Sequence, residues 1–111
     1  MKGKTAGQCF TAEIADTFWR RFLGLMGRRE ISPQTALLIR PCNSIHMFFM
    51  RFAIDAVFID ENFCVKKVVP GVKPWFGFAF CFGATAVLEF AAGEAARLKI
   101  EPGCRLTAIR R

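Results

Sequence analysis

The chain has no tyrosine and only one histidine, although it contains 13 phenylalanines and two tryptophans. Its aromatic side chains are therefore almost wholly apolar, and imidazole chemistry is restricted to His46. It also lacks a glycine-rich phosphate-binding motif, because the short G-x-x-G at 24–27 has no lysine after it. No residue pattern typical of a cofactor site is present, and we expect no cofactor.

The chain also lacks any C-x-x-C pair, since the nearest two of its five cysteines, Cys64 and Cys81, are 17 positions apart. With a single histidine, this spacing excludes the common zinc sites, and we expect no metal. No apolar signal segment opens the sequence, and charges interrupt every apolar run before the roughly 18 residues that a membrane span needs. An odd cysteine count without a signal segment predicts a soluble, cytoplasmic protein with reduced, mostly buried thiols.

The composition is 53% hydrophobic and 23% charged, which excludes a disordered chain. A length of 111 residues predicts a single domain over residues 1–111. The net charge of +7 suits an anionic partner, but the basic residues form scattered doublets at 20–21, 28–29, 66–67 and 110–111. Without a dense basic stripe or a recognisable motif, nucleic acid is an unfavoured partner.

Hydrophobic periodicity predicts a mainly β fold. Alternating or continuous apolar runs indicate strands at 8–15, 35–40, 53–60, 64–69, 85–91 and 104–109. One helix is expected at about 17–26, where Phe18, Phe22 and Leu25 form a stripe, and a short helical turn within 92–99. Pro70-Gly71 is expected to end the fourth strand. The pattern favours a small antiparallel sandwich or partly closed barrel of about six or seven strands, with one or two short helices.

The most apolar long segment, 42–60, also contains His46, Arg51 and Asp55. Burying unpaired polar or charged groups costs several kcal/mol, roughly, so these groups need partners or a solvent-facing pocket. One interpretation is a structural ion pair of Arg51 with Asp55 or Glu89. The other is a small-anion pocket, in which an ordered arginine and an imidazole bind the ligand. The candidate ligand-binding residues are Ser44, His46, Arg51, Asp55 and Glu89.

Nucleophilic and metal sites have weaker support in this segment. In an extended strand Cys42 and His46 are about 13 Å apart, too far for an activated thiol, whereas Ser44 and His46 are about 6.6 Å apart. No third group that would orient a Ser44–His46 pair can be identified. A metal site from His46 with Asp55 or Glu89 would have one imidazole and dispersed carboxylates, a weak donor set.

Between Gly71 and Gly83, phenylalanines alternate with small residues. A period of two places the rings on one face of an extended segment, with only small residues on the other. The segment either closes over the core or presents an exposed aromatic patch to a partner or a membrane surface. The candidate interaction residues are Trp75, Phe76, Phe78, Phe80 and Phe82.

Several blocks together resemble domain-of-unknown-function family 192, also called uncharacterised ACR. The blocks are RFLGLMGR at 21–28, SIHMFFMRFAIDAVFID at 44–60, VLEF at 87–90 with Gly93, and Pro102-Gly103. The sequence departs from the family pattern at Met47, Ala53, Phe76 and Cys104, where Thr, Pro, Arg and Asp are usual. The resemblance implies a mainly β fold with a short helix, and it implies no reaction.

The sequence thus predicts a binding or interaction module of unknown function, with a small-anion pocket as one hypothesis. Two alternatives from other classes remain. One is an enzyme that acts on a small anionic substrate with His46 as acid or base. The other is a structural subunit that docks, by self-association or with another protein, through the face formed by 76–82.

Overall fold

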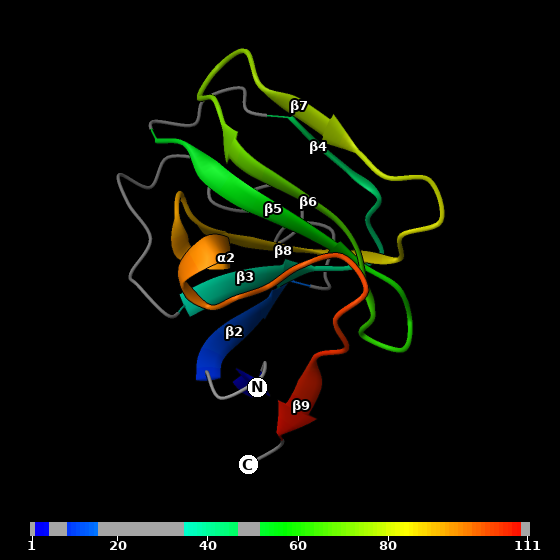
Figure 1. Cartoon of the computed structure of the whole chain (residues 1–111). Helices are drawn as coiled ribbons and strands as arrows, with labels where there is room; N and C mark the ends of the chain where they lie inside the picture. Colours follow the sequence, from blue (N-terminus) through cyan, green and yellow to red (C-terminus); the bar gives the residue numbers. More distant parts are fainter. Residues whose placement is uncertain (1, 5–8, 16–34, 47–51, 110–111) are drawn as a thin grey trace.

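A computed structural model of the chain describes residues 2–4, 9–15, 35–46 and 52–109 (Figure 1). Within these residues it contains nine strands and one short helix. The strands are β1 (Lys2–Lys4), β2 (Cys9–Ala15), β3 (Thr35–Ile39), β4 (Ser44–His46), β5 (Ile54–Ile59), β6 (Val65–Val72), β7 (Phe78–Phe80), β8 (Ala86–Ala91) and β9 (Thr107–Ile109), and the helix is α2 (Glu94–Arg97). The predicted mainly β fold is confirmed.

Seven strands form the main sheet, in the order β6-β5-β8-β3-β2-β1-β9, and β4 and β7 form a separate two-stranded sheet. Neighbouring strands are antiparallel except β2 and β3, which are parallel. A parallel pair needs a crossover of a dozen residues or more, and residues 16–34 supply that length. The β4–β7 sheet lies beside the β5–β6 end of the main sheet (Figure 1).

Both faces of the main sheet are covered at β5. Residues Ile54, Ala56 and Phe58 of β5 pack in one core, together with Ile45 of β4 and Ala79 of β7. The alternate residues of β5, Val57 and Ile59, pack in a second core with α2 and the segment that follows it, through Ala95, Leu98, Ile100 and Leu106. Because β5 is covered on both sides, all six of its residues are buried, which explains why five of them are apolar and why the sixth, Asp55, needs internal partners.

The expected break at Pro70-Gly71 is wrong, because β6 continues through both residues to Val72. The pairing with β5 shifts register between Ile54 and Ala56, so an irregularity in the ladder accommodates the proline. Gly71 adopts a left-handed φ of 61° and donates its N–H to Asp55 Oδ1 at 2.9 Å. The carboxyl group of Asp55 thus accepts the hydrogen bond that the N–H of Gly71 would otherwise donate to the neighbouring strand.

Other differences lie at the chain ends. β1 was not expected from its polar sequence, and it pairs with both β2 and β9. The last strand begins at Thr107 rather than at Cys104, although Arg105 forms an isolated bridge with Cys64. The predicted helix at 17–26 and Arg51 lie outside the described residues. Within the described ranges, no helix is long and apolar enough to cross a membrane.

Candidate functional site

An exposed aromatic face surrounds β7. Phe78 and Phe80 point outward from this strand, whereas Ala79 between them is buried. The turns on either side add three further rings. The exposed fractions are 47% for Trp75, 95% for Phe76, 67% for Phe78, 44% for Phe80 and 87% for Phe82. These five residues are called the aromatic face below.

Short-range packing fixes this face on the protein. Ala79 pairs with Ile45 of β4, and both are buried against the main sheet. Cys81, which is also buried, donates its backbone N–H to Asn43 O at 2.9 Å. These small inward residues let β7 approach the core closely. The alternation in sequence therefore sends the large rings to solvent.

The turn before β7 has no room for a side chain at Gly77. A Cβ there would overlap the carbonyl oxygen of Lys73 and lie 2.6 Å from Val72 Cγ1. In the same turn, the N–H of Gly77 donates to Lys73 O at 2.9 Å. Glycine at this position therefore closes the turn that orients Phe76 and Phe78.

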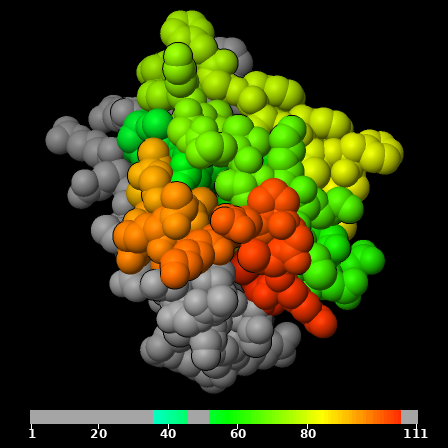
Figure 2. Space-filling view, in the orientation of Figure 1, coloured from blue at the N-terminus to red at the C-terminus, as the bar shows by residue number. Residues whose placement is uncertain are grey.

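Three exposed lysines border the aromatic face. Lys67 of β6 donates from Nζ to Phe80 O at 2.9 Å. The end of the Lys66 side chain lies 3.5 Å from the Cβ position of Gly83, beside Phe82. Lys73 is exposed two residues before Trp75. In Figure 2 the yellow residues of this region form the rim of the molecule beside the green residues of β6.

The register places two further candidates beside the same face. Ser44 lies opposite Phe80, and His46 lies opposite Phe78, in the β4–β7 pair. The sequence-based hypotheses treated these polar and aromatic positions separately, and the structure brings their backbones into one small sheet. Arg51 and the side chain of His46 lie outside what the structure describes, so a pocket shared by these two residues stays a prediction.

Asp55 is satisfied by backbone amides. It is 1% exposed and accepts three N–H groups. Oδ1 accepts from Gly71 at 2.9 Å, and Oδ2 accepts from Gly93 at 2.9 Å and Ala95 at 3.0 Å. A buried carboxylate with several such donors is a structural cross-link, here joining β5, β6 and the start of α2.

Glu89 has a different environment. It is 7% exposed, and its neighbours in the register are Leu37 of β3 and Ala56 of β5. No residue in the described part of the chain donates a hydrogen bond to its carboxyl group. Burial in this apolar setting raises its pKa to about 7. Glu89 therefore changes protonation near neutral pH, a property of acid–base groups in active sites.

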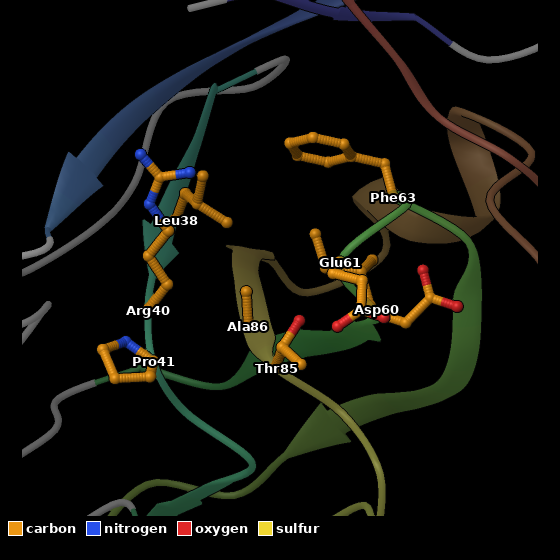
Figure 3. A pocket seen from close by; sticks show the side chains of 9 residues that line it. Leu38, Arg40, Pro41, Asp60, Glu61, Phe63, Thr85 and Ala86 are labelled. Carbon is orange, nitrogen blue, oxygen red and sulfur yellow. The ribbon is translucent and has the colours of Figure 1, made fainter.

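Sequence reasoning missed a pocket at one edge of the main sheet. Its volume is about 420 Å³, and its polar residues include Arg40, Asp60 and Thr85 (Figure 3). The available signal was a charged residue directly after each of two apolar strands. Only the topology brings these residues together, since Arg40 and Asp60 are 20 positions apart in the chain. Among the described residues, no group of three metal-ligating side chains comes together.

Comparisons with known proteins match this fold and sequence. The profile of the family described as uncharacterized ACR, domain of unknown function 192, matches residues 1–108. A UPF0127 protein of Thermococcus sibiricus is 34% identical over 108 residues, which are 90% of this chain and 68% of that protein. A UPF0127 protein of Pyrococcus furiosus is 35% identical over 116 residues, covering 96% of this chain and 95% of that protein.

Two solved structures share the architecture. A protein of unknown function from Novosphingobium aromaticivorans superimposes with a TM-score of 0.85 at 26% identity, covering 96% of this chain and 83% of that one. A Sinorhizobium meliloti protein, provisionally described as a transcription regulator, also has a TM-score of 0.85, at 25% identity, covering 96% of this chain and 91% of that one. These matches support the fold and leave the activity open.

Proposed function

The chain belongs to the uncharacterized ACR family, and we propose that it is an interaction module that docks reversibly on anionic lipid surfaces. The family has no assigned activity, so the proposal is argued from the surface of this chain. The contact surface is the aromatic face together with Lys66, Lys67 and Lys73. The exposure of the aromatic face carries the proposal.

Apolar burial supplies the first part of the binding free energy. Fully burying a phenylalanine side chain contributes about 1.5–3 kcal/mol. Phe76 and Phe82 are almost fully exposed, and Phe78 is more than half exposed, so all three have apolar area to bury. Partial insertion of these rings gives several kcal/mol, roughly, which suits a reversible attachment.

Charge favours an anionic occupant over a second copy of the chain. Two copies docked face to face would bring their lysine borders together, and the net charge of each copy is +7. On an anionic membrane, each lysine close to the lipid surface contributes about 1 kcal/mol to the binding free energy, whereas in a dimer it would face the lysines of the second copy. The inner leaflet of a cell membrane carries such lipids, which agrees with the predicted cytoplasmic location.

The shape of the face favours lipid over single-stranded nucleic acid. Proteins that bind single strands use a basic groove whose aromatic rings stack successive bases. Here the two most exposed rings, Phe76 and Phe82, lie in the turns on either side of β7, a strand on the outside of the molecule (Figure 1). Among the described residues, lysines rather than arginines border the face. Protruding apolar rings with lysines behind them fit a deformable headgroup layer.

Vesicle co-sedimentation tests the proposal. The protein should bind vesicles of phosphatidylcholine with about one third phosphatidylserine, and it should bind pure phosphatidylcholine vesicles at least about tenfold more weakly, because the lysines then lose their counter-charges. A Phe78→Ser/Phe80→Ser variant should lose at least about tenfold in affinity. A Lys66→Gln/Lys73→Gln variant should lose the preference for anionic vesicles and the sensitivity to salt.

Matched controls separate docking from folding. Lys99→Gln/Arg105→Gln removes two exposed charges that are not among the residues of the proposed contact surface, and it should leave vesicle binding unchanged. Circular dichroism should show that the serine variant keeps its fold. The lipid proposal is overturned if neither vesicle binds, if an oligonucleotide binds in place of vesicles, or if sedimentation shows a dimer that the serine substitutions dissociate.

A further inference from the structure

We propose that the pocket at the edge of the main sheet binds a small zwitterion of the amino-acid type, with an ammonium group at Asp60 and Glu61 and a carboxylate at Arg40. The pocket is called the strand-end pocket below. Its lining residues are Leu38, Arg40, Pro41, Ile59, Asp60, Glu61, Phe63, Thr85 and Ala86. This site is separate from the aromatic face, and the inference does not rest on lipid binding.

The topology brings the two charged sides together. β3 and β5 both pair antiparallel with β8, which lies between them, so β3 and β5 end at the same edge of the sheet. Arg40 directly follows β3, and Asp60 directly follows β5. Two strand spacings separate their backbones by about 10 Å. That distance leaves room for a small molecule between the side chains.

The start of β8 forms the wall between these two sides. The N–H of Thr85 donates to Ile59 O at 2.9 Å, and the carbonyl oxygen of Thr85 accepts the N–H of Cys42 at 3.0 Å. Both backbone groups are therefore used by the fold, and the hydroxyl of Thr85 faces the pocket in Figure 3. It supplies a neutral donor and acceptor between the positive and negative sides.

Arg40 is the cationic side. Its side chain is exposed, and within the described part of the chain it has no ion-pair or hydrogen-bond partner. In Figure 3 it lies across the pocket from Phe63, Glu61 and Asp60. A guanidinium with free donors binds a carboxylate through two parallel hydrogen bonds, which neutral side chains cannot match.

Asp60 anchors the acidic side. Its Oδ1 accepts the N–H groups of Asn62 at 2.8 Å and Cys64 at 3.0 Å. The hydrogen bond from Cys64, with smaller help from Asn62 and nearby cations, holds the pKa of Asp60 below its usual range. The carboxylate is therefore ionised at neutral pH and fixed in direction. Oδ2 has no donor among the described residues, and the next residue in the chain is the exposed Glu61.

Phe63 completes the pocket with an apolar wall. Its backbone is held in the left-handed region at φ 61°, and its N–H donates to Asp60 O at 3.0 Å. The same turn that fixes the Asp60 carboxylate therefore also places the Phe63 ring over the pocket. Leu38, Ile59 and Ala86 form the floor of the pocket and are themselves buried in the core below it. A volume of about 420 Å³ is in the size range of small-molecule sites.

The balance of charges selects the ligand class. The lining holds two carboxylates and one guanidinium, so a dianion such as inorganic phosphate can pair with Arg40 alone and leaves the acidic side without a counter-charge. A molecule with one ammonium and one carboxylate pairs with both sides, and an aliphatic side chain can contact the Phe63 ring. Leucine has these three features at a size that the pocket accommodates.

Binding of L-leucine, measured by calorimetry and NMR shifts on the full chain, tests this inference. Leucinamide lacks the carboxylate and N-acetyl-leucine lacks the ammonium, so each should bind at least about tenfold more weakly than leucine. Arg40→Gln should weaken the binding of leucine about tenfold and leave the binding of leucinamide unchanged, because leucinamide has no carboxylate for Arg40. Glu61→Gln should also weaken the binding of leucine about tenfold, and it should leave the binding of N-acetyl-leucine unchanged, because that ligand has no ammonium. Lys99→Gln and Glu101→Gln remove exposed charges that do not line the pocket, and both should bind leucine as the wild type does.

Arg40 and Glu61 are both exposed, so their variants should fold, and melting curves verify this. The inference is overturned if neither leucine nor L-lysine, which fits the acidic side more strongly, binds at millimolar concentration. It is also overturned if the two leucine analogues bind as well as leucine does, or if Arg40→Gln has no effect.

Discussion

Asp55 and Glu89 lie on adjacent strands, one register step apart, and their buried carboxyl groups face opposite sides of the main sheet. Glu89 pairs with Ala56 across β8 and β5, while Asp55 pairs with Phe90. Asp55 finds three backbone donors on its side, and Glu89 finds none among the described residues on the other. A difference of one residue in register therefore places Asp55 where backbone amides hold it and Glu89 where burial raises its pKa.

Glu89 should make stability fall as pH rises. Its pKa is about 7 in the folded protein, against about 4.5 in the unfolded chain, so the folded state binds its proton more tightly. Between pH 4.5 and 7 the free energy of unfolding should therefore decrease, by about 3 kcal/mol in total, and it should level off above pH 7. Urea unfolding across this range measures the slope.

A Glu89→Gln variant should lose this slope, because it has no proton to release. Glu101→Gln, at an exposed position, should keep it. Equal slopes for the wild type and Glu89→Gln would show that another group is responsible.

Asp55→Asn should destabilise the fold at neutral pH. The change removes the charge that strengthens three hydrogen bonds and turns an amide donor toward backbone N–H groups. We expect a loss of roughly 2–4 kcal/mol in the free energy of unfolding. Hydrogen exchange should accelerate first at Gly71, Gly93 and Ala95, and unchanged exchange at these amides would contradict the cross-linking role.

Two phenylalanines should respond oppositely to truncation. Phe58 is fully buried in β5, so Phe58→Ala should cost about 3–5 kcal/mol of stability. Phe82 is 87% exposed, and Phe82→Ala should change the melting temperature little. A large loss for Phe82→Ala would place its ring in the core.

Thiol titration should find few fast-reacting cysteines in the native protein. Cys81 is buried, and Cys42, Cys64 and Cys104 are half-buried. The thiolate is the reactive form and needs solvent access, so unfolding should raise the number of reactive groups. Five rapid thiols in the native state would contradict the predicted burial.

Much of the fold follows from local pattern. The β5 run and the β5–β6 hairpin were readable because both hydrophobicity and the turn at 60–62 are local signals. The parallel β2–β3 pair was not, since strand order depends on contacts between distant segments. Pro70 was misread for the same kind of reason, because the acceptor that compensates for the irregular ladder is Asp55, 15 positions earlier in the chain.

The candidate sites were predictable only in part. Alternating phenylalanines indicated one ring-bearing face, of which the β7 strand contains Phe78 and Phe80, but composition alone could not decide whether the core covered it. The sequence also indicated that the embedded carboxylates, if buried, need partners. Their partners could not be predicted, because almost every residue has a backbone N–H and the sequence does not show which one will be the donor. In addition, a one-residue change of register moves a side chain to the other face of the sheet.

The alternation in β7 also has an evolutionary consequence. Ala79 and Cys81 pack in the core, whereas Phe78 and Phe82 are mostly exposed and Phe80 is 44% exposed. Substitutions at the outward positions therefore change what the molecule touches at little cost in folding, and the inward positions tolerate almost no increase in size. Single substitutions of the exposed rings can therefore change the binding specificity of this surface while the fold beneath it stays the same.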